Sequence, residues 1–523
     1  MQQALKVIQV KKSVIPNLFF IVYSRNVIKT VDTGVEWMQR LFENTGVHIP
    51  EVMLPSKAVD LHKWSVIACD QYTSQPDYWE RVKKEVDGSP STLNLTFPEI
   101  YLKDDDRDSR IKNINESMSR YISQGILEPQ KQGFILVDRS TPHVASRKGL
   151  ILAVDLECYD YKSGSQTLIR ATEGTVLDRI PPRVKIRENA PIELPHIMLL
   201  IDDPEKTFIE KLFERKDSFK KVYDFELMQG GGHIRGWKVE GVESLALAAS
   251  ALKKLADPAS FMQKYGLQSK RQENRPPESG ESGDGSSDSP PSVLLFESGD
   301  GSSDSPPSVL LFAAGDGNHS LATAKAHWEN VKAGLGTQAA VDHPARYALV
   351  EVVNVHDEGL VFEPIHRVLF GIDGTKVLEN IKKTFNCKST TECRLFDSIA
   401  EMEAALNETK ERQNVHLLPF IMEGTFGLIS VENPSSGLEV GTLQTLLDEL
   451  VRANEHIEID YIHGEDVVTG LGSRKGCMGF YLPVMSKHDL FRTVILDGLL
   501  PRKTFSMGEA EEKRYYLECR RIR

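Results

Sequence analysis

The chain has 523 residues, enough for roughly two to four domains of about 150 residues each. Hydrophobic residues make up 40% of the chain and charged residues 26%, so most of it can bury a core. The formal net charge of −12 argues against non-specific binding of nucleic acid, because a protein that neutralises phosphates along a duplex needs a basic face. No apolar run reaches the roughly 18 residues of a membrane-spanning helix. We therefore expect neither nucleic acid nor a membrane as a partner.

Cysteine usage and the N-terminus bear on the compartment. None of the six cysteines belongs to a C-x-x-C pair, which favours reduced thiols in the cytoplasm. Residues 1–46 are predicted to be an N-terminal extension. Its first acid is Asp32, and basic, acid-poor N-termini are typical of organelle transit peptides, although Pro16 interrupts an amphipathic helix. A mitochondrion or plastid is thus the alternative to the cytoplasm.

Strands and helices alternate along the rest of the chain. Apolar and β-branched runs between polar turns predict strands at 64–69, 133–138, 149–158, 197–201, 309–312, 345–353, 359–370, 415–422, 425–431 and 477–483. Helical spacing of apolar residues predicts helices at 78–86, 111–122, 244–255, 321–328, 375–384, 399–411, 442–453 and 487–497. This alternation favours an α/β to α+β fold, with mixed sheets and packed helices in one compact, multi-lobed unit.

Residues 269–308 interrupt this pattern. The segment is rich in Ser, Gly, Pro and Asp and is predicted to be a disordered acidic insert. It contains most of a tandem repeat, in which Glu281–Phe296 reads ESGDGSSDSPPSVLLF and Glu297–Phe312 repeats it letter for letter. Two copies of Ser-Val-Leu-Leu-Phe thus compete for one strand, and we expect the second copy to fill it because it joins the next loop directly. The insert separates a predicted N-terminal lobe, 47–268, from a C-terminal lobe, 309–523.

The strongest candidate for chemistry is the loop that follows this strand, Gly315-Asp316-Gly317-Asn318-His319-Ser320. Glycines let a loop turn sharply and let backbone N–H groups approach an anion. The start of the following helix adds free donors and a partial positive charge. Asp316 could hold a metal or act as a base, Asn318 and His319 are neutral donors, and Lys325 lies about two turns further on. The loop predicts a cradle for phosphate or carboxylate, and a tight structural turn is the alternative.

A second candidate is a basic stretch that precedes the strand at 197–201. Its basic residues are Arg170, Arg179, Arg183, Lys185 and Arg187, interleaved with Glu173, Asp178, Glu188, Glu193 and His196. Arginine forks suit the recognition of phosphate or carboxylate. Anion-binding loops and a salt-bridged surface segment are both compatible with this pattern.

Two further pairs of polar residues adjoin predicted strands. Asp70 and Gln71 follow the strand at 64–69, where α/β folds place ligands, or they cap a helix. His366 and Arg367 could act as a general acid or base and a phosphate clamp, or His366 could be a satisfied structural residue. The two carboxylates beside a histidine at His463-Gly464-Glu465-Asp466 could hold a divalent cation, although such spacing is common in turns.

Long stretches of the sequence resemble one family, domain of unknown function 1015. They are WSVIACDQYTSQPDYW (64–79), DRIPPRVKIRENAPIELPHIMLLIDDP (178–204), DGNHSLATAK (316–325), HPARYALVE (343–351), FEPIHRV (362–368) and LPRKTFSMGEAEEKRYYLECRRI (500–522). Many relatives carry a DGHHR-type loop. That loop is similar to the phosphate-contacting loop of the ParB and sulfiredoxin superfamily, which includes nucleotide-dependent free-serine kinases. Here Ser320 stands in place of the arginine that would clamp phosphate.

Two functions remain open. The first is a small-molecule phosphotransferase, or another enzyme that acts on a phosphorylated or nucleotide ligand, and it implies Mg²⁺ and a nucleotide as cofactors. Its expected catalytic residues are Asp316, His319 and His366. Its expected ligand-binding residues are Gly315, Gly317, Asn318, Ser320, Lys325, Arg170, Arg183, Arg187, Arg367, Asp70 and Gln71. The second is a regulatory protein that binds a small anionic ligand without turnover. A hydrolase is a distant third, because neither Ser320 nor Ser506 lies in a G-x-S-x-G motif.

Overall fold

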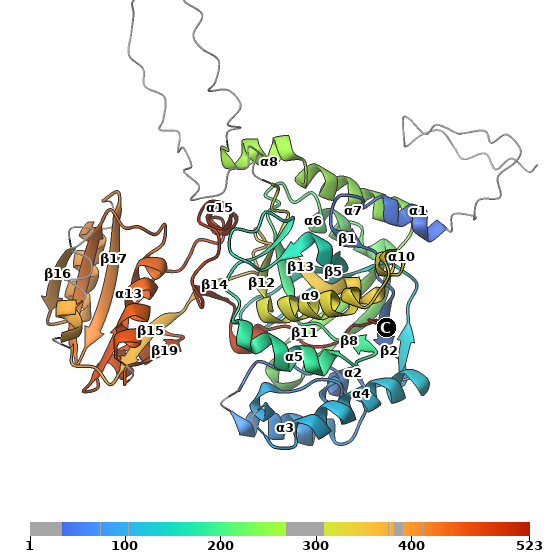
Figure 1. Cartoon of the computed structure of the whole chain (residues 1–523), viewed down its shortest axis with the longest axis horizontal. Coiled ribbons are helices and arrows are strands. Elements are labelled where there is room, and N and C mark those ends of the chain that lie inside the picture. Colours follow the sequence, from blue (N-terminus) through green and yellow to red (C-terminus); the bar gives the residue numbers. More distant parts are fainter. Residues whose placement is uncertain are drawn as a thin grey trace, which may run out of the picture.

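The computed structural model describes residues 34–73, 75–102, 104–267, 308–374, 376–380, 391–409, 412–454 and 456–523. Most of the predicted N-terminal extension, nearly all of the insert and the first copy of the repeat lie outside these residues, as does half of the helix predicted at 375–384. Within the described ranges, no helix is both long and apolar enough to cross a membrane. Figure 1 shows a larger and a smaller body, joined by extended segments.

A ten-stranded mixed sheet forms the centre of the larger body, in the order β10-β11-β4-β5-β13-β9-β12-β7-β6 with β1 paired to β5. Its strands are β1 (Val47–His48), β4 (Phe134–Ser140), β5 (Arg147–Asp155), β6 (Tyr159–Asp160), β7 (Ile169–Ala171), β9 (Met198–Ile201), β10 (Lys220–Glu226), β11 (His233–Val239), β12 (Phe312–Asp316) and β13 (Tyr347–Asn354). β12 runs antiparallel to β9 and parallel to β7. The central strands read as continuous apolar runs because both faces of the sheet are covered.

Each face of this sheet packs on its own core. Phe134, Leu136 and Leu152 face a core that also takes in α6 (Ile209–Phe213), α7 (Val242–Leu255), α8 (Pro258–Tyr265) and α9 (Asn318–Ala333). Ile135 and Ile151 face a second core, with α3 (Pro76–Val86), α4 (Arg107–Ser123) and a small sheet. That sheet, in the order β3-β2-β22-β8, consists of β2 (Val52–Pro55), β3 (Leu127–Pro129), β8 (Ile192–Glu193) and β22 (Cys519–Arg521).

The smaller body is built on a six-stranded antiparallel sheet, in the order β16-β18-β17-β20-β15-β19. Its strands are β15 (His366–Phe370), β16 (Thr391–Phe396), β17 (Val415–Met422), β18 (Thr425–Glu432), β19 (Glu458–Ile462) and β20 (Cys477–Phe480). α13 (Glu439–Ala453) packs on one face, and α12 (Ile399–Thr409) and α14 (Glu465–Gly472) pack on the other. The smaller body thus has a core of its own.

The chain then returns from the smaller body to the larger one. It passes through α15 (Leu490–Leu496), and β21 (Phe505–Met507) pairs with β14 (Phe362–Pro364). Isolated bridges join Leu500 to Glu173 and Tyr515 to Ile67. We call residues 500–523 the C-terminal strap, because they bring the end of the chain against segments near residues 67 and 173.

The predicted mixed α/β fold is confirmed, although the sheets group differently from the two predicted lobes. Strands from both sides of residues 269–308 enter the ten-stranded sheet, whereas residues 366–480 alone make the six-stranded sheet. The second copy of the repeat leads into β12 as predicted, and the Leu311 N–H donates to Leu168 O over 2.8 Å. The strand predicted at 64–69 is wrong. Asp60 caps a short helix, α2 (Leu61–Trp64), and the buried residues after it make a single bridge.

Candidate functional site

The loop from β12 into α9 is shaped by two glycines. Gly317 has φ 74°, in the left-handed region that glycine tolerates, and a Cβ there would lie 3.0 Å from Ile197 Cα. A Cβ at Gly315 would lie 2.8 Å from Leu200 Cγ, and the pairing of β12 with β9 shifts register between Ala314 and Asp316. Such irregularities re-aim side chains at the end of a strand. The loop therefore lies tightly against β9, with Asp316 at its turn.

Free backbone donors lie at the start of α9. The first of its N–H groups to find a backbone acceptor is that of Leu321, which donates to Gly317 O over 2.9 Å. Among the described residues, the N–H groups of Asn318, His319 and Ser320 have no acceptor. Free N–H groups at a helix N-terminus, with the helix dipole behind them, favour an anion.

Asp316 is held between the loop and the C-terminal strap. Its Oδ1 accepts the Gly317 N–H over 2.8 Å, and its Oδ2 lies 3.4 Å from Lys513 Nζ. Lys513 is itself fixed, because it also donates to Ser506 Oγ over 3.1 Å and to Met507 O over 3.2 Å. The Lys513 side chain is 12% exposed and that of Asp316 28%, so this ion pair lies at the edge of the protein interior.

A buried histidine, His196, lies on the other side of the loop. Its Nδ1 is 2.8 Å from the Tyr516 hydroxyl, and its Nε2 is 3.1 Å from Ser320 Oγ and 3.6 Å from Asp70 Oδ2. Burial favours the neutral ring, but the nearby carboxylates, Asp70 first and then Asp316, outweigh it and raise the pKa of His196. Burial likewise disfavours ionised Asp70, but His196, Gln71 and Lys513 lower the pKa of Asp70 well below its usual range. Both shifts favour the ion pair of an imidazolium and a carboxylate, with the His196 side chain 9% exposed and that of Asp70 32%.

Two residues at the start of α9, His319 and Asn318, hydrogen-bond to the segment that follows β7. Burial, reinforced by Arg179 and Arg183, lowers the pKa of His319 to about 4, and its Nε2 accepts the Val176 N–H over 3.2 Å. The Asn318 side chain accepts the Thr172 N–H over 3.3 Å and donates to Ala314 O over 3.1 Å. Asn318 thus ties the start of α9 to the end of β7.

A further carboxylate, Glu173, follows β7 at this site. Burial raises the pKa of Glu173, and the charge of Asp316 adds to this effect, whereas backbone N–H groups of Lys503 and Thr504 oppose it. A carboxyl group with a raised pKa beside a second carboxylate is a candidate for proton transfer. In the sequence, Glu173 stands within the basic stretch, where no role was predicted for it.

The structure brings together only some of the residues predicted from sequence. Asp70, Gln71, Gly315, Asp316, Gly317, Asn318, His319 and Ser320 lie in one cluster, with Arg183 close enough to lower the pKa of His319. Arg183 itself pairs with Glu99. Lys325 points elsewhere, because its ammonium pairs with Glu329 at 2.7 Å.

The other predicted basic residues are held by protein partners outside the loop at Asp316. Arg170 donates to Thr167 O over 2.9 Å and to Ser308 O over 2.8 Å, and Arg187 pairs with Glu193 at 2.5 Å. Arg367 is fully buried and donates to Gln444 Oε1 over 3.0 Å and to the carbonyl oxygens of Arg502 and Lys503. Their predicted contact with a ligand stays a prediction.

His366 belongs to the smaller body. Its Nδ1 accepts the Leu482 N–H over 3.0 Å, and burial beside Arg367 lowers its pKa to about 4. Among the described residues, His366 makes no hydrogen bond or ion pair with the loop at Asp316. A catalytic role for His366 at this loop therefore gains no geometric support.

The site also contains residues that sequence analysis missed, above all Lys513 and Tyr516. Both come from the C-terminal strap, and Tyr516 is 320 positions from the His196 that it contacts. In the sequence, only the basic residues Lys503 and Lys513, in a stretch that resembles the family, could have indicated a role in binding an anion. Their spacing does not relate them to Asp316. Only the folded chain brings them together.

The described residues do not fit a metal held by the protein alone. In the part of the chain that the structure describes, no three His, Cys, Asp or Glu side chains are grouped to hold an ion. The oxygens of Asp316 already face the Gly317 N–H and Lys513 Nζ. Lys513 thus occupies the place beside Asp316 where a cation would bind.

Comparison with solved structures finds partial likenesses. A conserved hypothetical protein from Pyrococcus furiosus is 18% identical, with a TM-score of 0.24 over 40% of this chain and 71% of that one. A free serine kinase in complex with AMP is 10% identical, with a TM-score of 0.34 over 71% of this chain and 92% of that one. SbnI with a C-terminal truncation, from Staphylococcus aureus, is 9% identical, with a TM-score of 0.29 over 68% of this chain and 83% of that one.

Comparison by sequence gives the family. No curated protein matches the chain. The profile described as "Protein of unknown function (DUF1015)" matches residues 53–450, which include the Asp316 loop, Glu173 and His196. The chain therefore belongs to the DUF1015 family.

Proposed function

We propose that this chain is a small-molecule phosphotransferase that takes a phosphorylated or nucleotide ligand at the start of α9. The proposal is supported above all by one observation: carboxylates and cationic side chains lie together around backbone N–H groups that have no acceptor. Asp316 and Glu173 supply carboxylates, and Lys513 and His196 supply cations, beside the N–H groups of residues 318–320. Phosphoryl transfer is catalysed mainly by such positioning and charge stabilisation.

The start of α9 supplies the phosphate cradle. Three N–H groups and the helix dipole attract an anion, and the Ser320 hydroxyl adds a fourth donor to them. Ser320 lacks the charge of the arginine found in DGHHR-type loops. His196, a cation 3.1 Å from Ser320 Oγ, supplies positive charge at this place instead. Lys513 supplies a second positive charge on the strap side.

Glu173 is the group proposed to move the proton. Its raised pKa brings it closer to neutral pH, where a carboxylate is a more effective base. It would accept the proton of an acceptor hydroxyl while that oxygen forms a bond to phosphorus. The phosphorus–oxygen bond to the donor breaks, and its electron pair leaves with the donor. Because the described residues do not fit a protein-held Mg²⁺, no step of this proposal depends on one.

Ligand stabilisation of the purified protein tests the cradle. ATP, ADP, pyrophosphate, serine and phosphoserine are each added with and without Mg²⁺, and the melting temperature is measured. A ligand at about 100 times its Kd stabilises by about 2.7 kcal/mol, which a melting curve resolves. Lys513→Met should abolish the shift, whereas Lys325→Met, in α9 but with its ammonium paired with Glu329, should keep it. Absence of any shift with every phosphate compound would overturn the proposal.

Turnover separates this proposal from the second function, a regulatory protein that binds an anion without chemistry. That alternative is favoured by one observation, the neutralisation of Asp316 by Lys513. Phosphorus NMR of the protein with the stabilising ligand and a panel of hydroxyl acceptors follows transfer directly. Glu173→Gln should slow transfer by roughly 10²–10⁴ and leave the melting shift intact. Binding without transfer to any acceptor would favour the regulatory function.

A further inference from the structure

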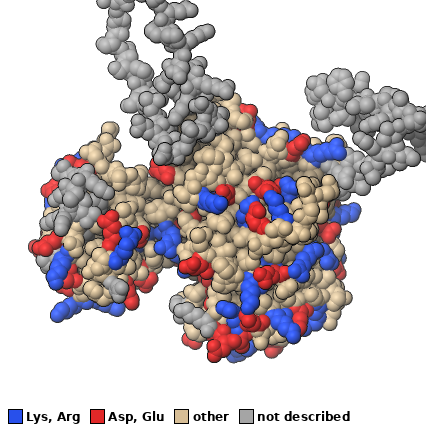
Figure 2. All heavy atoms as spheres, in the orientation of Figure 1, with Lys and Arg blue, Asp and Glu red and all other residues tan. Residues whose placement is uncertain are grey.

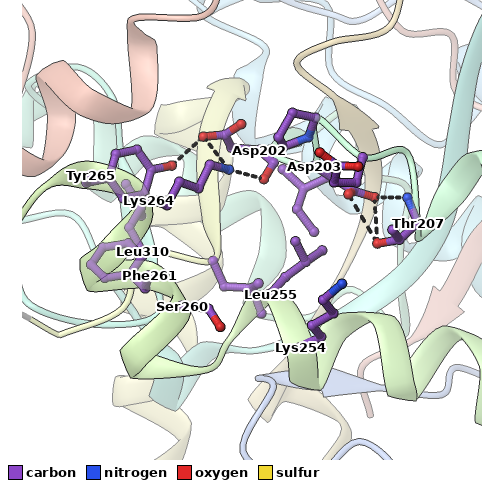
Figure 3. A pocket seen from close by; sticks show the side chains of 14 residues that line it. Asp202, Asp203, Thr207, Lys254, Leu255, Ser260, Phe261, Lys264, Tyr265 and Leu310 are labelled. Carbon is purple, nitrogen blue, oxygen red and sulfur yellow. Dashed lines mark hydrogen bonds and ion pairs between the residues drawn. The ribbon is translucent and has the colours of Figure 1, made fainter.

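A cavity of about 200 Å³ lies away from the Asp316 loop, at the carboxyl end of β9 (Figure 3). Its apolar walls come from β9, α7, α8 and the chain that leads into β12, as Ile201, Leu255, Phe261, Leu310 and Leu311. An apolar cavity of about 150 Å³ is large enough to hold a benzene ring. This cavity can therefore take a branched aliphatic or a phenyl side chain.

Two acids that line the cavity are already satisfied by protein partners. Asp202 pairs with Lys264 at 2.8 Å and with His356 at 2.6 Å, and it also accepts the Tyr265 hydroxyl. Asp203 is buried and accepts the N–H groups of Thr207 over 2.6 Å and Phe208 over 2.8 Å. Figure 3 shows the contacts of Asp202 with Lys264 and Tyr265, and those of Asp203 with Thr207, on the upper side of the cavity. Neither carboxylate is left to bind a ligand.

Two other charged side chains that line the cavity, Lys254 and Glu205, are available to bind a ligand. Lys254 is exposed at the end of α7, and Glu205 is exposed in the turn after β9. Within the described residues, neither side chain has an ion pair or a hydrogen bond, with the other or with any third residue. In Figure 3 the Lys254 side chain rises from α7 towards the side of the cavity that carries Asp203. The cavity thus offers one positive and one negative group beside an apolar interior.

We infer that this cavity binds a free amino acid with an apolar side chain, such as leucine or phenylalanine. The carboxylate would bind Lys254, the ammonium group would bind Glu205, and the side chain would fill the space beside Phe261 and Leu311. A few placed polar groups around an apolar interior are the usual construction of a small-molecule site. The inference is independent of the proposed phosphotransferase activity, since the cavity and the Asp316 loop lie at opposite ends of β12.

Calorimetric titration of the full chain, with no nucleotide present, tests this assignment. L-leucine and L-phenylalanine should bind, while 4-methylpentanoate and 3-methylbutylamine, which each lack one of the two charges, should bind at least tenfold more weakly. L-serine, which cannot fill the apolar interior, should also bind at least tenfold more weakly. Failure of both apolar amino acids to bind, or equal binding of the acid, the amine or serine, would overturn the inference.

Variants test the place of binding. Lys254→Met and Glu205→Gln should each weaken leucine binding at least tenfold. Lys253→Met is the matched control, because Lys253 is an exposed neighbour on α7 that does not line the cavity. It should bind leucine as the wild type does. All three substitutions are at exposed positions, so the folded state is expected to persist, and circular dichroism checks this. Equal affinities of the Lys254→Met and Lys253→Met variants would place binding elsewhere and contradict the inference.

Discussion

At the scale of single residues, Gly317 sets the conformation on which the cradle depends. Its positive φ lets the chain turn from β12 into α9, and the space above it is closed by Ile197. The sequence motif indicated a turn at this glycine, since glycines bracket a polar loop there. It did not indicate Ile197, because a close approach between a loop and a neighbouring strand is a property of the packed structure.

Gly317→Ala is expected to destabilise the protein by about 1–3 kcal/mol, because alanine would be strained at this φ and would crowd Ile197. Urea unfolding measures the change. Gly336→Ala is the control, since its φ of −73° is ordinary and a Cβ there meets nothing within 4 Å. Gly336 is the N-cap of α10 (Thr337–Val341), where alanine is somewhat disfavoured, so that variant should stay within about 1 kcal/mol of the wild type. Equal losses in both variants would contradict this account of the loop.

The charge of His196 makes a prediction about pH. Its pKa is raised in the folded state above its usual value of about 6.5, because the carboxylates of Asp70 and Asp316 outweigh burial. A raised pKa contributes stability that is fully present below the unfolded pKa and is lost as pH rises through the folded pKa. The difference in free energy of unfolding between the wild type and His196→Gln should therefore be largest near pH 6 and shrink at higher pH. A difference that grows with pH would refute the imidazolium assignment.

At the scale of secondary-structure elements, local patterns predicted many strands well. The hairpin predicted at 415–422 and 425–431 is β17 and β18, and the strands predicted at 133–138 and 149–158 lie over β4 and β5. These strands could be predicted because the apolar and β-branched residues that mark them are close together in the sequence. Residues 65–69 look the same by that measure, yet they are covered by the strap and pair only at Ile67. A strand's pairing with a partner far along the chain cannot be predicted from the local sequence.

Long-range contacts also explain why the strap residues Lys513 and Tyr516 could not be predicted as part of the site. Arg514 of the strap forms ion pairs with Glu351 of β13 and with Glu518, and all three side chains are buried. This triad fixes the strap on the sheet and so places Lys513 and Tyr516 against the loop. The sequence resemblance marked residues 500–522 as a unit, but it carried no information on what the unit touches.

Arg514→Met should destabilise the protein by about 3–5 kcal/mol, because it leaves two carboxylates buried without a cation. Urea unfolding measures the loss. Arg521→Met, at an exposed position of the same strap, is the control and should change stability by less than about 0.5 kcal/mol. If Arg514→Met were as stable as the control, the strap would owe its position to other contacts.

At the scale of the whole molecule, the surface and the two bodies bear on function. On the face that Figure 2 shows, basic and acidic side chains are interspersed and do not gather by sign. The bodies are joined through Arg367, at the start of the six-stranded sheet. Arg367 donates to the carbonyl oxygens of residues 502 and 503, while Glu173 forms a bridge with Leu500 and the nearby backbone N–H groups of residues 503 and 504 oppose the rise of its pKa. The strap thus connects the smaller body to the site.

Arg367→Met is expected to loosen this connection, because it removes every donor that reaches the strap from this side chain and leaves the Gln444 carbonyl oxygen buried without a partner. Hydrogen exchange should then speed up at residues 500–507 and at β15, while β5, in the core of the larger body, keeps its protection. Arg394→Met, on the edge strand β16 of the same sheet, should change neither region. Faster exchange in β5 to the same extent would mean that Arg367 stabilises the whole molecule instead of joining its two bodies. Unchanged exchange at residues 500–507 would mean that the strap holds Glu173 in place without the smaller body.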